Sequence, residues 1–216
     1  MNSGHWFETL RAILELLYFV AGIVIAGAAI WGLQQIRLTK QIAIKNAKRE
    51  DLKFAAERCQ YYAEKCVELE TKALSEGRQL GLSLFTTPVQ FEIEEGEIVK
   101  HNVNLQVAGQ QVSRMSISLV AYLNSLEAFA IPFVAGVSDE ELGFQETAPA
   151  FCSGIRQSIA ALVVLRTSGY RYESCIKLYE CWSKRLKVED IKKKMKELEK
   201  QSKATDTPKI KPIGGV

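Results

Sequence analysis

The sequence predicts a mainly α-helical protein with a single-pass membrane helix, a long connector helix and a cytoplasmic helical bundle. Three observations support this fold class. An uncharged apolar run occupies residues 16–33. Most of the chain after it carries apolar residues at the three- and four-residue spacing of one helix face. Residues 77–109 depart from this spacing, which predicts an inserted segment that is a small β-hairpin or an ordered loop.

The apolar run reads LLYFVAGIVIAGAAIWGL and is long enough to cross a membrane. At about 1.5 Å per residue it covers roughly 27 Å, and extension back to residue 12 gives about 33 Å, against a hydrocarbon core of about 30 Å. A cleaved signal peptide is one alternative, because residues 26–28 resemble a cleavage site. However, the preceding segment is not basic and the run exceeds the usual apolar length. A buried core helix is the other alternative, but such helices usually keep a polar stripe. We therefore expect an uncleaved transmembrane helix over residues 12–33.

Basic residues are unevenly distributed around this helix. Arg11 alone precedes it, whereas six follow closely: Arg37, Lys40, Lys45, Lys48, Arg49 and Lys53. The positive-inside rule then places residues 1–11 outside the cell and the remainder in the cytoplasm, with the helix in the inner (plasma) membrane. The six cations are also expected to attract anionic headgroups, by about 1 kcal/mol each, so the lipid bilayer is the first predicted partner.

Small residues recur at four-residue spacing within the predicted membrane helix. Gly22 and Ala26 form one such pair, and Ala28 and Gly32 form another. Pairs of this kind let two membrane helices approach closely, so these residues are candidates for association of the anchor with a second copy.

Residues 34–76 lack glycine and proline and are predicted to form the connector helix. The second half of this segment has apolar residues at alternating three- and four-residue spacing: Leu52, Ala55, Cys59, Tyr62, Cys66, Leu69 and Ala73. This heptad seam predicts that the second half packs against the bundle, whereas the first half is basic and solvated. Gly77 is expected to end the helix.

The segment 77–109 shows short apolar and polar alternation on both sides of Gly96. A β-hairpin with its turn near Glu95 and Gly96 is one interpretation, and an ordered loop is the other. Val103, Leu105 and Val107 alternate as well, and the sequence predicts no helix before residue 110.

Residues 110–200 are predicted to form the helical bundle, packed against residues 52–76. The first helix carries a long seam: Val112, Met115, Leu119, Tyr122, Leu126, Phe129 and Phe133. A second membrane span is an alternative for this helix, but it contains Arg114, Asn124, Glu127 and Pro132.

Two further helices are expected in the bundle. Ser138 and Glu141 have the spacing of a capping box, and a helix follows from about Ala148 with Ile155, Ile159, Leu162 and Val163 inward. The last helix begins near Tyr172, buries Cys175, Tyr179, Trp182 and Leu186, and continues as an amphipathic helix through Val188, Ile191, Met195 and Leu198. Residues 201–216 are predicted to be a disordered tail.

Glu127 is the charged residue with the most apolar surroundings, and it lies one turn after Asn124. A carboxylate on a core helix generally needs a partner, because an unpaired buried charge is costly. We expect a buried ion pair with Arg156, Arg166 or Arg171. The alternative is a small-ligand site built from Asn124, Glu127 and Arg166.

Counts of reactive residues point away from an enzyme. The chain has two histidines, His5 and His101, which the predicted topology places on opposite sides of the membrane. It contains neither a Gly-x-x-x-x-Gly-Lys motif nor a GxGxxG motif. The five cysteines form no Cys-x-x-Cys pair, and a net charge of +3 is modest. We expect no catalytic residue, no cofactor, no metal and no nucleic-acid partner.

The stretch YLNSLEAFAIPFVAGVSDEELG resembles a family of small bacterial proteins that carry a domain of unknown function. The matching positions are Asn124, Glu127, Gly136, Asp139, Arg166 and Trp182. The resemblance covers roughly residues 122–186 and implies one N-terminal membrane helix, a polar helical connector and a helical cytoplasmic domain. It does not extend to residues 77–109, and it implies no established activity.

The function expected from these observations is that of a non-enzymatic, membrane-anchored helical interaction or scaffold module in a bacterial cell. Its partner would be another protein or a second copy of the chain. Small anchored proteins of this type often serve stress or phage-defence systems, which gives one specific version of the hypothesis. A membrane-tethered sensor that binds a small ligand near Glu127 is the alternative.

Overall fold

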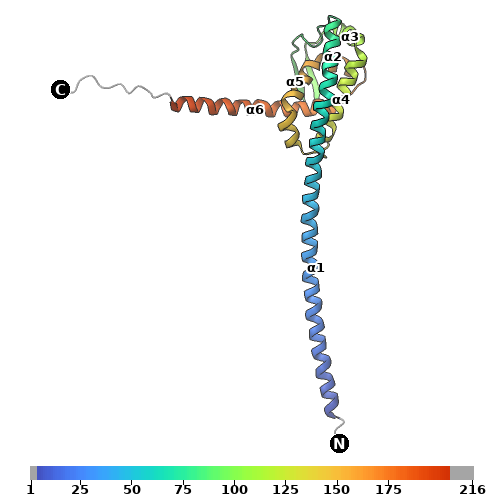
Figure 1. Cartoon of the computed structure of the whole chain (residues 1–216), viewed down its shortest axis with the longest axis vertical. Coiled ribbons are helices and arrows are strands. Elements are labelled where there is room, and N and C mark those ends of the chain that lie inside the picture. The colour runs from blue at the N-terminus through green and yellow to red at the C-terminus, as the bar shows by residue number, and fades with distance from the viewer. Residues whose placement is uncertain (1–3, 205–216) are drawn as a thin grey trace, which may run out of the picture. The chain divides into compact units, whose positions relative to one another are not determined.

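The computed structural model describes residues 4–204, and Figure 1 shows the order of the elements along the chain. The protein is mainly α-helical with one two-stranded antiparallel sheet, which confirms the predicted fold class. It divides into two compact units, residues 1–50 and residues 51–216, which are described separately below.

The first unit consists of most of helix α1 (Gly4–Tyr61). This helix contains the predicted membrane segment and the predicted connector as far as Tyr61, so no break separates the two in the backbone. From Ile13 onward the large apolar side chains of the unit are exposed, and Ile23 and Ile25 have 72% and 69% of their surface accessible. Residues 1–3 of the predicted extracytoplasmic segment lie outside the described residues.

In the second unit, the end of α1 continues through a π-helical stretch, η1 (Tyr62–Cys66), into α2 (Val67–Gln79). Ala55, Tyr62, Cys66 and Ala73 are buried, and η1 and α2 pack against α4. Cys59 and Leu69 are half-buried and Leu52 is exposed, so the predicted seam forms the inward face of this segment only from Ala55 onward.

Helix α2 ends later than predicted. Gly77 lies inside it, and Gly81 adopts the left-handed conformation (φ 63°) that closes it. The backbone N–H of Leu82 donates to the carbonyl of Gly77 at 2.9 Å, the long hydrogen bond of a Schellman motif.

The predicted hairpin interpretation of the inserted segment is confirmed. Strands β1 (Phe91–Glu94) and β2 (Glu97–His101) pair antiparallel, with Ile93 opposite Ile98. Glu95 and Gly96 both have positive φ, as a two-residue turn of type I′ requires.

Residues 105–134 form two helices, where the sequence predicted one helix that starts after residue 109. Helix α3 (Leu105–Arg114) begins earlier because the Asn104 side chain accepts a hydrogen bond from the Val107 N–H and caps it. Met115 then leaves the helical conformation (φ −132°), and α4 (Ser116–Val134) follows. The predicted seam from Val112 to Phe133 is nevertheless buried throughout.

Helix α5 (Glu140–Thr167) begins eight residues before the predicted start at Ala148, and the predicted capping box is wrong. Asp139 caps the helix, since its Oδ1 accepts from the Leu142 N–H at 2.9 Å. The Ser138 hydroxyl is instead buried without a hydrogen-bond partner among the described residues. A carboxylate at this position stabilises the positive end of the helix dipole better than a neutral hydroxyl does.

The last helix, α6 (Glu173–Ala204), enters the core through its first half. Trp182 is fully buried, and its ring packs against Phe129, Phe133, Phe144 and Phe151 with centroid distances of 5.4–6.2 Å. The second half is exposed at its apolar positions Val188, Ile191, Met195 and Leu198. The helix extends beyond the predicted start of the tail at residue 201, and residues 205–216 of that tail lie outside the described residues.

Three helical segments are long and apolar enough to cross a membrane, where the sequence predicted one: residues 13–79, α4 and α5. The three segments differ in the share of their most apolar residues that is buried. The most apolar window is 0% buried in the first segment, but 56% buried in α4 and 67% buried in α5.

Gly143 provides a test of core packing. A Cβ atom at this position on α5 would collide with the ring of Phe133, which is itself buried against Phe129 and Trp182. We expect Gly143→Ala to lower the free energy of unfolding by about 1–3 kcal/mol, although alanine favours a helix by about 1 kcal/mol.

The matched control is Gly109→Ala on α3, where an added Cβ meets no atom within 4 Å. This variant should be unchanged or slightly more stable. Urea denaturation followed by near-UV circular dichroism measures both variants, and equal midpoints for the two would contradict the collision.

Candidate functional site

Glu127 on α4 holds the start of α6. Its Oε1 accepts a hydrogen bond from the Ser174 N–H at 3.0 Å, and its Oε2 accepts from the Cys175 N–H at 2.9 Å. The first N–H groups of a helix have no partner within the helix, and the helix dipole there favours a negative charge. Glu127 is therefore satisfied by backbone donors, and the predicted ion pair with an arginine is not observed among the described residues.

Asn124 and Arg166 both contact residues just before α6, but among the described residues neither forms a hydrogen bond or an ion pair with Glu127. The Tyr172 hydroxyl donates to Asn124 Oδ1 at 3.2 Å. The Arg166 guanidinium donates to the Arg171 carbonyl at 2.6 Å and forms an ion pair with Glu97 on β2. The three residues of the predicted ligand site thus serve two structural connections, one to α6 and one to the hairpin.

We expect Glu127→Gln to lower the free energy of unfolding by about 1–2 kcal/mol, because an amide offers one acceptor oxygen where the carboxylate offers two. Glu199→Gln, an exposed substitution on α6, is the matched control and should have no effect. Urea denaturation measures both, and an unchanged midpoint for Glu127→Gln would show that the capping bonds contribute nothing.

The buried cysteines are poorly suited to nucleophilic chemistry. Burial, followed by the nearby charge of Glu127, raises the pKa of the Cys175 thiol well above its usual value. Burial also raises the pKa of Cys66 to about 11. A thiol reacts through its thiolate, so both groups are almost entirely protonated at neutral pH. Cys181 on α6 is exposed.

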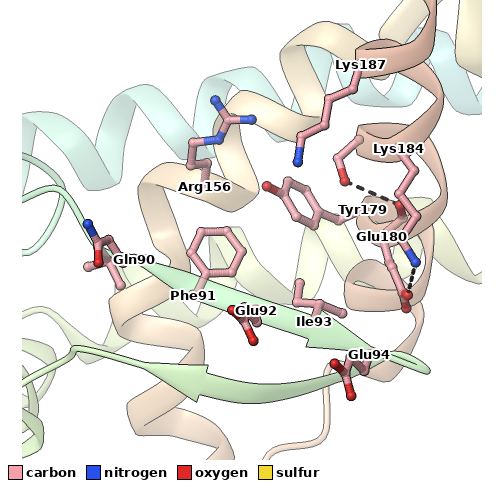
Figure 2. A pocket seen from close by; sticks show the side chains of 12 residues that line it. Gln90, Phe91, Glu92, Ile93, Glu94, Arg156, Tyr179, Glu180, Lys184 and Lys187 are labelled. Carbon is pink, nitrogen blue, oxygen red and sulfur yellow. Dashed lines mark hydrogen bonds and ion pairs between the residues drawn. The ribbon is translucent and has the colours of Figure 1, made fainter.

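A different site lies where the hairpin meets α5 and α6. Figure 2 shows this pocket, which has a volume of about 630 Å³. Its apolar wall comes from Phe91 and Ile93 on β1 and from the ring of Tyr179 on α6. Its basic residues are Arg156 on α5 and Lys184 and Lys187 on α6.

The alternation of β1 explains why this strand forms the wall. Phe91 and Ile93 are half-buried, while Glu92 and Glu94 between them are exposed. The rings of Phe91 and Tyr179 lie 5.8 Å apart. Successive residues of a strand point to opposite faces, so the apolar face of β1 packs towards α6 and the acidic face is left in solvent.

Contacts at the turn hold the hairpin against α6. The Gly96 N–H donates to Glu180 Oε2 at 2.8 Å, and the Lys177 stem lies where a side chain on Gly96 would be. Lys184 forms an ion pair with Glu180 at 2.5 Å. The Lys184 ammonium, together with the Gly96 N–H, lowers the pKa of the Glu180 carboxyl, which stays ionised at neutral pH.

The pocket contains charges without partners. Among the described residues, neither Arg156 nor Lys187 has a hydrogen bond or an ion pair, and the Tyr179 hydroxyl has no hydrogen bond. In Figure 2 these three groups lie on one side of Phe91, whereas the carboxylates of Glu92 and Glu94 point the other way. This side of the pocket can attract and hydrogen-bond an anion.

The sequence did not reveal this site. It suggested Arg156 only as a partner of Glu127, and it placed Lys184 and Lys187 in the last helix without assigning them to a site. The predicted hairpin could have led to the site. One face of β1 is apolar and must pack against another element, and an aromatic residue on a later helix, such as Tyr179, is a suitable partner.

The residues predicted for the membrane helix and its basic flank all belong to α1. Arg37, Lys40, Lys45, Lys48, Arg49 and Lys53 are exposed on α1, and Lys53 has an ion pair with Glu57 at 3.8 Å. Gly22, Ala26, Ala28 and Gly32 are exposed too. Comparison with protein-family models, with curated proteins and with solved structures finds no match to the chain, so the resemblance to a bacterial family stays a prediction.

Proposed function

We propose that the chain is a single-pass, membrane-anchored helical module that binds a protein partner or further copies of itself. Its N-terminus would lie outside the cell and its bundle in the cytoplasm. The observation that carries this proposal is that no part of the most apolar window in the first candidate segment is buried. Eighteen apolar residues in a row are stable in this state only if lipid or another protein covers them.

The burial of α4 and α5 supports a single span. Leu119 and Leu126 on α4 and Ile159 on α5 are at most 1% exposed within the bundle. Moving either helix into a bilayer would remove these side chains from the core and expose the rest of it. The proposal therefore assigns membrane crossing to the N-terminal segment alone.

The orientation rests on the basic residues that follow the apolar run. Their side chains are exposed, so they can contact anionic headgroups. Cys181 offers a test in the intact cell, because it is the exposed cysteine among the described residues. A membrane-impermeant maleimide should label it only after the inner membrane is permeabilised.

Cys181→Ser is the control for that labelling and should remove most of it. Rapid labelling of the natural protein in cells whose inner membrane is intact would place the bundle outside and reverse the proposed orientation.

Association through the anchor is supported by its open small-residue positions. A Cβ added at Gly22 or Gly32 meets no atom within 4 Å, so each glycine is free to receive a neighbouring helix. We expect crosslinking in native membranes to capture a discrete oligomer that is lost when Gly22 and Ala26 are both replaced by leucine.

Gly27→Leu is the matched control, because residue 27 lies on a different side of the helix, about 140° from Gly22 at about 100° per residue. This variant should keep the oligomer. A protein that stays monomeric in its natural form would overturn association through the anchor. A sensor with its ligand at Glu127 is not favoured, because both carboxylate oxygens already accept N–H groups of α6.

A further inference from the structure

We propose that the pocket between the hairpin, α5 and α6 binds a small, water-soluble phosphate monoester whose organic group is flat and apolar. This proposal does not depend on the membrane topology or on self-association. It rests on the charges that line the pocket, on the surface beside them, and on the contacts that hold the pocket open.

The charges of the pocket favour an anion with two negative charges. Lys184 is paired with Glu180 inside the pocket. Glu92 is paired with Lys100 at 2.7 Å, and the carboxylates of Glu92 and Glu94 both point away from the basic side. Arg156 and Lys187 are left as the cations without a partner in the described part of the chain. Two unpaired positive charges match a phosphate monoester, which carries close to two negative charges at neutral pH.

The donors on this side also suit a phosphate group. A guanidinium presents a planar pair of N–H donors to two phosphate oxygens, while an ammonium contributes a point charge. Arg156 and Lys187 come from different helices and lie on the same side of Phe91 in Figure 2. The Tyr179 hydroxyl lies between them in that view and can donate to a third oxygen.

The pocket is larger than a phosphate ion alone would fill. A volume of about 630 Å³ lies in the range of small-molecule sites, whereas one phosphate would leave most of it to water. Beside the basic groups, Phe91 and Tyr179 present aromatic surface, and Ile93 extends it along β1. A flat apolar group attached to the phosphate would cover this surface.

The structure also gives the pocket a fixed shape. The turn is held to α6 by the Gly96–Glu180 hydrogen bond, and β2 is held to α5 by the Arg166–Glu97 ion pair. Both contacts lie outside the basic side of the pocket, so a ligand there would not compete with them. A site that is already formed loses less entropy on binding than one that must be assembled.

Phenyl phosphate is the probe for this proposal, and isothermal titration calorimetry on the full chain in neutral detergent is the measurement. We expect 1:1 binding of phenyl phosphate, with inorganic phosphate at least about tenfold weaker and benzyl alcohol without measurable binding. Arg156→Gln and Lys187→Gln should each weaken the binding of phenyl phosphate by about tenfold or more. Both side chains are exposed, so neither substitution should unfold the bundle.

Lys192→Gln is the matched control, because Lys192 is an exposed cation of the same helix outside the pocket. Its affinity for phenyl phosphate should equal that of the natural protein. Three results would overturn the proposal: no binding of phenyl phosphate, equal loss of affinity in Lys192→Gln and Arg156→Gln, or equal affinity for inorganic phosphate and phenyl phosphate.

Discussion

Trp182→Ala is expected to lower the free energy of unfolding of the bundle by about 3–5 kcal/mol. The indole is fully buried and contacts four aromatic rings, from α4 and α5. Its Nε1–H also donates to Glu140 Oε1 at 2.5 Å. Truncation to alanine removes these contacts and leaves a cavity that the neighbouring rings, which also pack against one another, can fill only in part.

The measurement is urea denaturation of the full chain. Unfolding is monitored by the rate at which the Cys175 thiol reacts with a thiol reagent. Cys175 is completely buried in the native state and lies on the same helix. Trp182→Phe is the control, because it keeps an aromatic ring but removes the N–H donor, and it should cost about 1–2 kcal/mol. A loss below about 1 kcal/mol for Trp182→Ala would show that α6 is not part of the core.

Replacing Val24 and Ile25 together by arginine is expected to release the protein from the membrane. Each arginine at the centre of a membrane helix costs about 2.5–3.5 kcal/mol on the insertion scale, so the pair opposes insertion by about 5–7 kcal/mol. Both positions lie near the middle of the apolar run, and both side chains are exposed. The variant should be found in the supernatant after alkaline extraction, whereas the natural protein should stay in the pellet.

The control for this experiment adds the same two charges at the end of the apolar run. Gln34→Arg with Gln35→Arg should remain in the membrane, because arginine in this position reaches the headgroups and adds to the positive flank. If the natural protein itself is extracted by alkali, the proposed transmembrane anchor is wrong.

The helices of the bundle were largely predictable from the spacing of their apolar residues. The seam from Val112 to Phe133 is buried over its full length, even though the backbone breaks at Met115. The break could not be seen in the pattern, because a single residue outside the helical conformation leaves the three- and four-residue spacing almost intact.

The helix boundaries were less predictable, because short polar signals compete there. The alternation of Val103, Leu105 and Val107 resembled a strand, but the Asn104 side chain caps a helix at that point. Pro149 lies inside α5, although proline usually marks a helix start or a loop. At Asn104 a local capping bond outweighed the strand-like alternation, and at Pro149 the helix continues through the proline.

The candidate site could not have been predicted because its parts are distant in sequence. The contact that fixes the hairpin on α6 joins Gly96 to Glu180, 84 residues apart. The partners of Glu127 are backbone N–H groups, and no choice among the three arginines could have identified them. Side-chain chemistry identifies which groups need partners, and only the packing of α4 against α6 shows which groups supply them.

The π-helical stretch Tyr62–Cys66 is the place in this helical segment where the loss of one residue should be tolerated best. A π turn holds one residue more than an α turn, so it accommodates an extra residue without ending the helix. Deleting one residue there would restore ordinary α-helical hydrogen bonds with the segments before and after it still in phase, whereas a deletion within α1 or α2 would rotate one segment against the other by about 100°. Ala55 and Ala73, which are buried on either side of η1, would keep facing the core after the deletion in η1, so η1 is where the chain carries one residue more than its inward face needs.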